Sequence, residues 1–392
     1  MITAIADDIT GAAEIAGVCL RLGIPVSFSL DVKPVDKGVL VVATDTRSLN
    51  VEEAVKETKA LAQKLLETGT QHVFKKTDSV LRGHVAEELE AMAKVFEKAK
   101  IVLAPANPYT ERTIRNGEYF VKGKPLDQTD FSDDPEFPAS SSLIRKLVHP
   151  AELPVHIGDF SGEGGWQKGI SIPDSANMDD LTALAGHIDD EVVPAGSGAF
   201  FEAYLRTNFE HLCGTAPQQE NNHPMEGDGL LVAGSNHFQT HDFIKNALAN
   251  GIKVCEMPKM LKIQEIHHGK LGDWITDVKF LLQNFGKVIL TLGKIQVRFD
   301  NCSHILKERM AYTVVRAIQE HGIQELLVSG GATVYAIISK LNWREFVPLE
   351  ELSPGVVRLR EQSTGCYLTI KPGSYDWPDE IISFFDMACD RV

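Results

Sequence analysis

Residues 2–22 read ITAIADDITGAAEIAGVCLRL, and the predicted fold starts from this stretch. Residues 2–6 form a short apolar run typical of a buried strand, and the apolar residues between 12 and 22 then recur at helical spacing. Two adjacent acids, Asp7 and Asp8, stand between these patterns. The stretch therefore predicts a buried strand that passes through an acidic turn into an amphipathic helix.

The same alternation continues along the chain. Apolar runs at residues 38–44, 72–76 and 101–104 read as strands, and helical patterns follow Asn50 and occupy about 84–97. Further strand patterns of the same kind return after residue 150 and again after residue 229. This order of strands and helices predicts an α/β fold with doubly wound, mostly parallel sheets.

One segment breaks the alternation. Residues 115–125 carry the turn signals Asn116-Gly117 and Lys122-Gly123 around a short apolar stretch, which predicts a β-hairpin insertion. The edges of such a hairpin could pair across a homodimer. Residues 130–142, DFSDDPEFPASSS, predict a loop after the hairpin.

The chain is long enough for two domains. It has 392 residues, and residues 216–228, APQQENNHPMEGD, are polar and lack periodicity, which makes them the best candidate for a linker. We therefore expect an N-terminal domain over 1–215, a C-terminal domain over 229–392, and an active-site cleft between the two. Both are expected to be doubly wound α/β domains.

Composition narrows the class of partner. The formal net charge of −15 disfavours nucleic acid, because a strongly acidic protein repels a polyphosphate backbone at long range. The six cysteines are scattered and form no C-x-x-C pair, so neither a zinc site nor a disulfide framework is expected. The sequence shows no signal-peptide pattern at its start and no apolar run long enough for a bilayer, so we expect a cytoplasmic protein without a membrane partner.

Charged residues follow the predicted strands of the first domain. Because ligands of open parallel sheets bind beyond the carboxyl ends of strands, these positions are candidate substrate contacts. Carboxylates accept hydrogen bonds from hydroxyl groups, and arginine or lysine binds a carboxylate, so the set suits a small polyhydroxy acid. The candidate residues are Asp7, Asp8, Arg47, Lys76, Thr77, Asp78, Ser79 and Arg82.

Asp8 is also the candidate general base toward a substrate hydroxyl. A structural alternative exists for each member of the set. One aspartate could serve only as a helix N-cap, Arg47 could be a surface ion-pair partner, and the lysines before Asp78 could be a solvated edge. Their shared position at strand ends favours a functional interpretation.

Small, neutral residues follow the predicted strands of the second domain. Glycine lets a backbone approach a ligand closely, and amides at a helix N-terminus bind phosphate. Neither a Walker A loop nor a dinucleotide fingerprint is present, and a glycine pair after a strand can also be a simple tight turn. The candidate nucleotide contacts are Ser235, Gly330, Gly331, Ala332, Thr333 and Gly373.

Together the two sets predict transfer of a phosphoryl group from ATP to a hydroxy acid. Such a transfer depends mainly on positioning and charge stabilisation, and Lys76 or Arg82 could neutralise the transferred group. Mg²⁺ is expected with the nucleotide, although no metal-ligand spacing is visible in the sequence. Two alternatives stay open: a sugar-phosphate phosphatase, although Asp7 and Asp8 are adjacent rather than two apart, and a non-catalytic two-domain sensor of a small acid.

At these residues the chain resembles the four-carbon acid sugar kinase family, also known as DUF1537 proteins. The resemblance runs in family order over nearly the whole chain, and its first and third stretches are the specific ones. The matching stretches are Ala6–Ala12, Thr44–Arg47, Lys75–Gly83, Asn116-Gly117 with Val121–Leu126, Gly196–Gly198, Gly234-Ser235, Ser329–Thr333 and Lys371–Gly373.

The resemblance implies ATP-dependent phosphorylation of acids such as threonate, erythronate or 3-oxo-tetronate. It implies substrate contacts at Asp8, Arg47 and Lys76–Ser79 in an N-terminal domain. It implies nucleotide contacts at Ser235, Gly330–Thr333 and Gly373 in a C-terminal domain.

The sequence departs from the family pattern at four places. Glu14 stands where aspartate is frequent, and Ala332 replaces an acidic or polar residue. Residues 236–240 replace a small residue followed by proline, and Tyr375-Asp376 replaces Phe-Gly. Most departures lie in the nucleotide half, which leaves room for a subfamily with another substrate.

Overall fold

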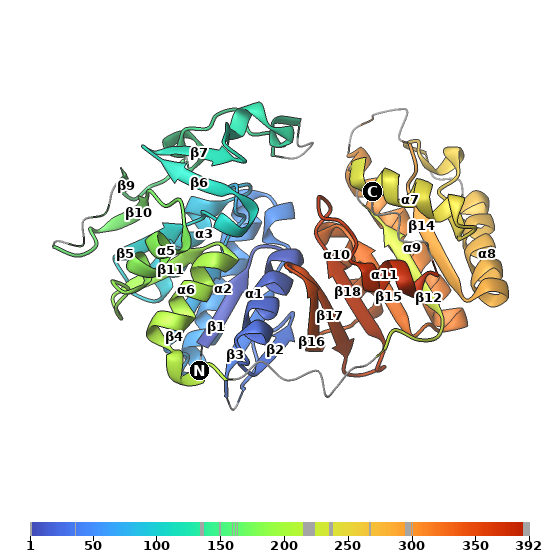
Figure 1. Ribbon diagram of the computed structural model, residues 1–392, viewed down its shortest axis with the longest axis horizontal. Coiled ribbons are helices and arrows are strands. Elements are labelled where there is room, and N and C mark those ends of the chain that lie inside the picture. Colours follow the sequence, from blue (N-terminus) through green and yellow to red (C-terminus); the bar gives the residue numbers. More distant parts are fainter. Residues whose placement is uncertain are drawn as a thin grey trace. The chain divides into compact units, whose positions relative to one another are not determined.

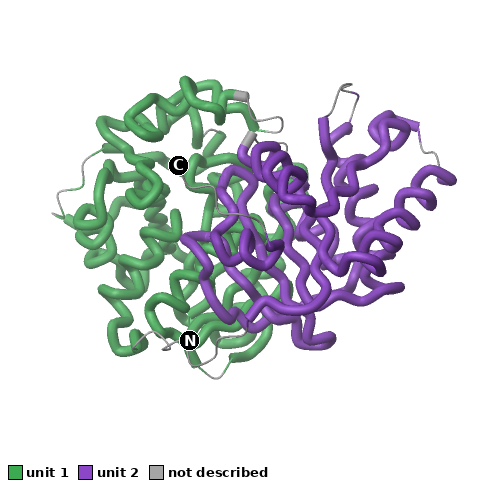
Figure 2. The backbone as a smooth tube through the Cα atoms, turned by 45° about the vertical axis from the view of Figure 1, so that its right-hand side comes forward, with its two compact units in different colours: residues 1–217 green, residues 218–392 purple. Residues whose placement is uncertain are grey.

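The chain folds into two compact units, Met1–Pro217 and Gln218–Val392, in the computed structural model (Figure 2). Each unit is a domain-sized α/β body with its own hydrophobic core. The structure describes residues 2–35, 37–133, 137–148, 150–158, 160, 162, 164–214, 224–234, 238–265, 268–294, 299 and 301–386. Ser235 and most of the expected linker, residues 216–223, lie outside these described residues.

A parallel sheet forms the centre of the N-terminal unit (Figure 1). Its strand order is β2-β3-β1-β4-β11-β5-β10-β9, and every neighbouring pair is parallel. All five residues of β1 are buried, as expected for a strand covered on both faces. The strands are β1 (Ile2–Ala6), β2 (Val26–Ser29), β3 (Val39–Ala43), β4 (His72–Lys76), β5 (Lys100–Ala104), β9 (Val155–Gly158), β10 (Gly169–Pro173) and β11 (Val192–Gly196).

Helices cover both faces of this sheet. Two consecutive residues of β4 point to opposite faces, since side chains alternate along a strand. Lys75 pairs with Glu88 of α3, whereas Lys76 pairs with Glu14 of α1, so these two helices lie on opposite faces. α2 packs on α3, and α1 and α5 pack on α6. The helices are α1 (Ile9–Arg21), α2 (Val51–Glu67), α3 (Val85–Val95), α4 (Ile144–Leu147), α5 (Met178–Ala185) and α6 (Gly198–Asn208).

A small antiparallel sheet is inserted between β5 and β9. It has the order β6-β7-β8, with β6 at Arg112–Arg115, β7 at Glu118–Val121 and β8 at Lys124–Pro125. Asn116 and Gly117 both have positive φ, 51° and 70°, as a two-residue hairpin turn requires. The predicted hairpin is confirmed, and it begins three residues earlier than predicted.

The sheet of the C-terminal unit is mostly parallel. Its order is β13-β14-β12-β15-β18-β17-β16; the first five strands run parallel, and β17 is antiparallel to both neighbours. The predicted α/β class is therefore confirmed, but the β16–β17 hairpin was not predicted. The strands are β12 (Gly229–Ala233), β13 (Lys253–Glu256), β14 (Lys287–Thr291), β15 (Glu325–Ser329), β16 (Glu345–Ser353), β17 (Val356–Glu361) and β18 (Tyr367–Lys371).

Five helices of the C-terminal unit fall within the described residues. They are α7 (Phe238–Ala249), α8 (His268–Phe285), α9 (Cys302–His321), α10 (Gly331–Leu341) and α11 (Asp379–Phe384). α9 packs against both α8 and α10. Among the helices of the described residues in either unit, none combines the length and the apolar character needed to cross a bilayer.

Candidate active site

Asp7 and Asp8 follow β1 and meet an arginine from the neighbouring strand. Arg47 lies in the short turn after β3, and its Nη2 is 2.8 Å from Asp7 Oδ2 and 3.1 Å from Asp8 Oδ1. Its Nε donates to Asp7 Oδ2 at 2.9 Å. β1 and β3 are parallel neighbours, so their carboxyl ends bring these side chains together. The arginine thus joins two adjacent carboxylates.

Asp8 also caps helix α1. Its Oδ1 accepts the backbone N–H of Gly11 at 2.8 Å, and its Oδ2 accepts the hydroxyl of Thr10 at 2.5 Å. The capping alternative from the sequence is therefore correct for Asp8, but it does not exclude a second role, because the same carboxylate meets Arg47. Asp7 has no such local use: its Oδ1 is buried and accepts no hydrogen bond from any described residue.

A third carboxylate comes from the turn after β4. Asp78 accepts hydrogen bonds from Nε and Nη2 of Arg82, at 2.9 and 2.8 Å, in a bidentate guanidinium–carboxylate pair. Nη1 of Arg47 lies 3.6 Å from Asp78 Oδ1. Arg47 is therefore shared among three aspartates, which unites the turns after β1, β3 and β4 in one buried ionic cluster.

Lys76 adds a buried cation next to this cluster. Its Nζ is 3.1 Å from Glu14 Oε2 of α1 and donates to the carbonyl of Thr77 at 2.9 Å. Gly11 explains how the amine fits, because a Cβ there would lie 2.8 Å from Asp8 Oδ1 and 3.3 Å from Lys76 Nζ. Any side chain at Gly11 would therefore displace both the aspartate and the lysine.

Thr77 and Ser79 complete the predicted stretch. Both are buried, and Thr77 joins the sheet through a hydrogen bond from its N–H to the carbonyl of Gly196 at 3.1 Å. The hydroxyl of Ser79 accepts a hydrogen bond from Arg112 of the inserted hairpin. Lys75, the other lysine of the stretch, points away: it is 1% exposed and pairs with Glu88 at 2.6 Å on the opposite face of the sheet.

Burial and pairing set the protonation of the cluster. Burial raises the pKa of Asp7, and Arg47 only partly offsets this. For Asp8, burial acts in the same direction, but Arg47 and the hydroxyl of Thr10 outweigh it and hold the pKa below its ordinary value. For Asp78, the two arginines overcome burial and hold the pKa well below the usual range. The site therefore contains two firmly ionised carboxylates beside a third that takes up a proton more readily.

Three residues near the cluster were not among the predicted contacts. Glu14 holds Lys76, Asn107 donates to Glu14 at 3.2 Å, and Arg112 reaches Ser79. Glu14 lies six residues after Asp8, almost two turns into α1. This helical spacing could have indicated from the sequence that Glu14 lies near the cluster. Asn107 comes three residues after β5, so its place beyond a strand end was a signal that the sequence offered. Arg112 lies beyond the 3₁₀ turn Pro108–Thr110, and no local pattern indicates where that segment folds.

The predicted glycine-rich positions of the C-terminal unit also come together. Gly330 precedes helix α10, has φ of 104°, and donates its N–H to the carbonyl of Lys371 at 3.0 Å. Gly234, after β12, lies so close to α10 that a Cβ on it would be 2.3 Å from Thr333 Oγ1. β12, β15 and β18 are neighbours in the sheet, so their carboxyl ends surround the first turn of α10.

This arrangement offers backbone donors to an anion. The first amides of a helix lack intrahelical acceptors, and Gly331 and Ala332 lie in that first turn of α10. Gly373 lies in the turn after β18, two residues beyond the strand whose carbonyl receives Gly330. Gly330–Thr333 and Gly373 are thus near one another, while the predicted contact Ser235 lies outside the described residues.

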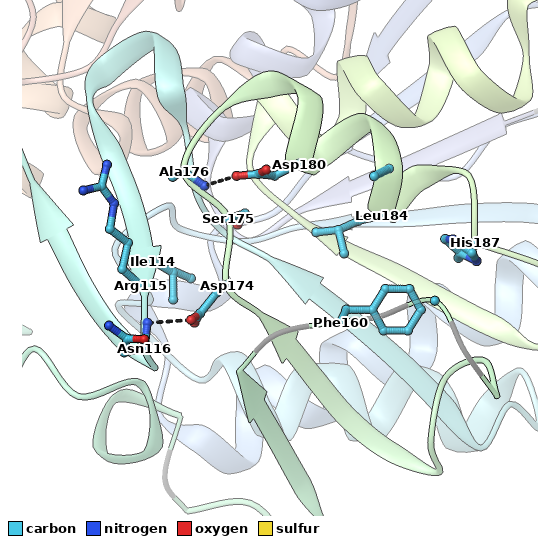
Figure 3. Close-up of a pocket in the computed structure, with 12 residues that line it drawn as sticks. Ile114, Arg115, Asn116, Phe160, Asp174, Ser175, Ala176, Asp180, Leu184 and His187 are labelled. Atoms are coloured by element: carbon cyan, nitrogen blue, oxygen red, sulfur yellow. Dashed lines mark hydrogen bonds between the residues drawn. The ribbon is translucent and has the colours of Figure 1, made fainter.

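A separate cavity of about 550 Å³ lies in the N-terminal unit, between the inserted hairpin and α5 (Figure 3). The two aspartates that line the cavity both accept hydrogen bonds from backbone N–H groups. Asp174 accepts the N–H groups of Asn116 and Gly117, and Asp180 accepts the N–H of Ala176 at 2.7 Å. The predicted site residues do not line this cavity. Asp174 therefore holds the turn of the hairpin in place, and the cavity is not the predicted active site.

Comparison with known families matches both halves of the chain. Residues 2–204 match the model of a sugar-binding N-terminal domain, and residues 230–375 match that of a nucleotide-binding C-terminal domain. The chain belongs to the four-carbon acid sugar kinase family.

Relatives that are named as sugar-acid kinases cover from half to nearly all of the chain. A 3-oxo-tetronate kinase of Pectobacterium atrosepticum is 24% identical over 95% of both chains. A D-threonate kinase of Salmonella typhimurium is 24% identical over 89% of this chain and 88% of its own. A D-threonate kinase of Bordetella bronchiseptica is 30% identical over 50% of this chain and 52% of its own.

Two solved structures share the fold. Haemophilus influenzae protein HI1011, assigned to DUF1537, aligns with a TM-score of 0.69 and 19% identity over 98% of this chain and 99% of its own. A Salmonella typhimurium LT2 structure, provisionally described as a tRNA synthase, aligns with a TM-score of 0.74 and 19% identity over 98% and 97%. At these identities the likeness establishes the fold alone.

Proposed function

We propose that the protein transfers the γ-phosphoryl group of ATP to a hydroxyl of a four-carbon sugar acid of the threonate, erythronate or 3-oxo-tetronate type. The observation that carries the proposal is the ionic cluster of Asp7, Asp8, Asp78, Arg47 and Arg82 at strand ends of the unit that matches a sugar-binding domain. In a cluster of this kind, the carboxylates can accept hydrogen bonds from the hydroxyl groups of a ligand, and the guanidinium groups can donate hydrogen bonds to its carboxylate. The relatives named above act on acids of this class.

The proposed roles follow from the contacts. The aspartates accept hydrogen bonds from substrate hydroxyls. The oxygen of one hydroxyl attacks the γ-phosphorus, ADP leaves, and Asp8 accepts the proton that this hydroxyl loses. A low pKa is compatible with this role, because the hydroxyl loses its proton late in a loose phosphoryl-transfer transition state. Lys76 or Arg82 offsets charge on the transferred group. Thr77 and Ser79 shape the same strand end.

The nucleotide half of the proposal rests on helix α10. The amides of Gly331 and Ala332 and the turn at Gly373 are proposed to hold ATP phosphates, together with Ser235 and Thr333. Mg²⁺ is proposed to accompany the nucleotide, since it binds largely through phosphate oxygens and water and needs few protein ligands. A cytoplasmic location belongs to the same proposal, because ATP is the donor.

The test is a turnover screen with the full chain. Four-carbon sugar acids are incubated with ATP and Mg²⁺, and ADP and phosphate esters are followed by ³¹P NMR. We expect one ester per ADP with at least one acid, and no turnover with EDTA present. Phosphate release from a sugar-acid phosphate without ATP would instead indicate a phosphatase, and binding of an acid without any turnover would indicate a sensor.

A further inference from the structure

Arg112 reaches the candidate site from the inserted hairpin. It is the first residue of β6, it is half-buried, and its Nη1 donates to the hydroxyl of Ser79. The guanidinium also lies over the ring of Phe131, with Cζ 5.3 Å from the ring centroid. Its Nε is buried and has no hydrogen-bond partner among the described residues. All of these contacts are to neutral groups.

The other cations of the site differ in this respect. Arg47 and Arg82 pair with aspartates, and Lys76 pairs with Glu14. For Arg112, no carboxylate of the described chain lies within 4.0 Å of a guanidinium nitrogen. A half-buried charge without a counter-ion is costly, so this position favours an anion that arrives with a ligand.

Phe131 contacts the guanidinium groups of two arginines. Cζ of Arg82 lies 5.5 Å and Cζ of Arg112 lies 5.3 Å from the centroid of its ring. Arg82 is already committed to Asp78 through two hydrogen bonds. Arg112 is therefore the arginine that retains donors, and Ser79 and Phe131 hold its guanidinium at the edge of the ionic cluster.

We propose that Arg112 binds the carboxylate of the sugar-acid substrate and so selects acids over neutral sugars or polyols. The inference deepens the proposed function and rests on it. A planar guanidinium binds a carboxylate through two parallel hydrogen bonds, and the hydroxyl of Ser79 keeps the group in place. A site built around such a pair rejects a ligand that lacks the charge, because the arginine is then left unpaired.

The test compares Arg112→Gln with Arg115→Gln. Arg115 is exposed, lies on the same strand, and points to the opposite face of the hairpin, so it controls for loss of positive charge. Binding of a four-carbon acid and of erythritol, its neutral polyol counterpart, is measured by calorimetry without ATP. We expect acid affinity to fall at least about thirtyfold in Arg112→Gln and to be unchanged in Arg115→Gln, with erythritol affinity equal in both.

Two further measurements separate selection from structural damage. Arg112→Lys keeps the charge without the planar fork, so it should recover part of the affinity, and added guanidinium ion should partly restore Arg112→Gln. Where turnover is measurable, the KM for the acid should rise and the KM for ATP should not. The comparison of Arg112→Lys with the wild type decides the matter even if Arg112→Gln folds poorly.

The proposal is overturned if Arg112→Gln binds the acid as tightly as the wild type, or if acid and erythritol lose affinity equally. Failure of the proposed function looks different. A wild type that binds the acid but never consumes ATP would refute the kinase assignment while the binding data still decide the role of Arg112. A wild type that binds no four-carbon acid would remove both proposals.

Discussion

Asp8 performs two tasks with one carboxylate. It accepts the N–H of Gly11 as a helix cap and it meets Arg47 across the strand ends. An uncharged side chain of the same shape can do only the first task, because asparagine caps a helix about as well as aspartate does but carries no charge. The two tasks can therefore be separated by a single substitution.

We predict that Asp8→Asn keeps the fold and loses turnover. The melting temperature should fall by only a few degrees, because the cap survives and the ion pair with Arg47 is lost, whereas kcat should fall at least about a hundredfold through loss of the charged proton acceptor. Thermal melting checks the predicted stability, and steady-state kinetics checks the predicted loss of turnover. Asp8→Ala is the matched variant, and it should also lose about 1 kcal/mol of stability with the cap.

Asp7 provides the contrast to this prediction. Its Oδ1 has no hydrogen-bond partner among the described residues, and burial raises its pKa, so it is the better placed of the pair to take up a proton fully. An Asp7→Asn variant that loses turnover, together with an Asp8→Asn variant that keeps it, would move the role of base from Asp8 to Asp7.

Lys371 makes the C-terminal unit sensitive to alkaline pH. It is 1% exposed, donates to the carbonyls of Pro372 and Tyr375, and lies 5.1 Å from the ring of Trp377. Burial lowers its pKa to about 8, against a smaller opposite effect of Asp376. An unfolded lysine has a pKa of about 10.4, so between these values the unfolded chain binds more protons and the free energy of unfolding rises with pH.

We therefore predict that wild type gains stability relative to Lys371→Met as pH rises from 7.5 to 9.5. The gain in unfolding free energy should be about 1–2 kcal/mol, since the buried ammonium loses its proton over this range only in the folded state. Urea unfolding followed by tryptophan fluorescence measures it. Parallel pH curves for the two proteins would show that Lys371 does not carry a depressed pKa.

At the level of single residues, the sequence identified the ionic set but not its neighbours. Asp7, Arg47 and Asp78 could be predicted because each directly follows a recognisable strand, and parallel strands end at one edge. The opposite directions of Lys75 and Lys76 also follow from alternation along a strand. Arg112 could not be predicted, because its contact with Ser79 depends on how an insertion folds back over the sheet.

Helix α10 is the element on which the proposed nucleotide binding depends. Its first turn contains Gly331, and Gly330 before it has a positive φ that only glycine adopts readily. Gly331 itself is not among the positive-φ residues, so its backbone accepts a side chain. An acid in the first turn of a helix is favourable for the helix and unfavourable for a bound phosphate.

We predict that Gly331→Asp raises the KM for ATP by about tenfold or more and leaves the KM for the acid within about twofold, because the new charge faces phosphate. The melting temperature should not fall, since the acid complements the helix dipole. Steady-state kinetics with each substrate varied in turn makes the comparison. A larger effect on the acid than on ATP would mean that the two binding roles are reversed.

Long periodic elements were predictable, and short or antiparallel ones were not. The helix after Asn50 begins where the sequence indicated, with Asn50 accepting the N–H of Glu53 at 3.0 Å. β2 and β13 have four residues each, too few for a period to stand out. The β16–β17 hairpin does carry a turn signal in the sequence, because Pro354-Gly355 stands between its two strands.

At the scale of the whole chain, the protein has two units that match two different binding domains. Residues 2–204 match the sugar-binding model and carry the ionic cluster; residues 230–375 match the nucleotide-binding model and carry the glycine-rich strand ends. From the sequence, the length and the alternation of elements predict two domains, at residues 1–215 and 229–392. In our proposal, the identity of the acid depends on side-chain positions around Arg112 and Asp78 that no sequence pattern specifies.

The most direct measurement is hydrogen–deuterium exchange of the full chain with each ligand added alone. A four-carbon acid should protect peptides around Asp8, Asp78 and Arg112, and an ATP analogue should protect peptides around Gly331 and Gly373, each without the other ligand. Protection of the same unit by both ligands, or no protection near Gly331 by the nucleotide, would contradict the division of labour on which the kinase proposal rests.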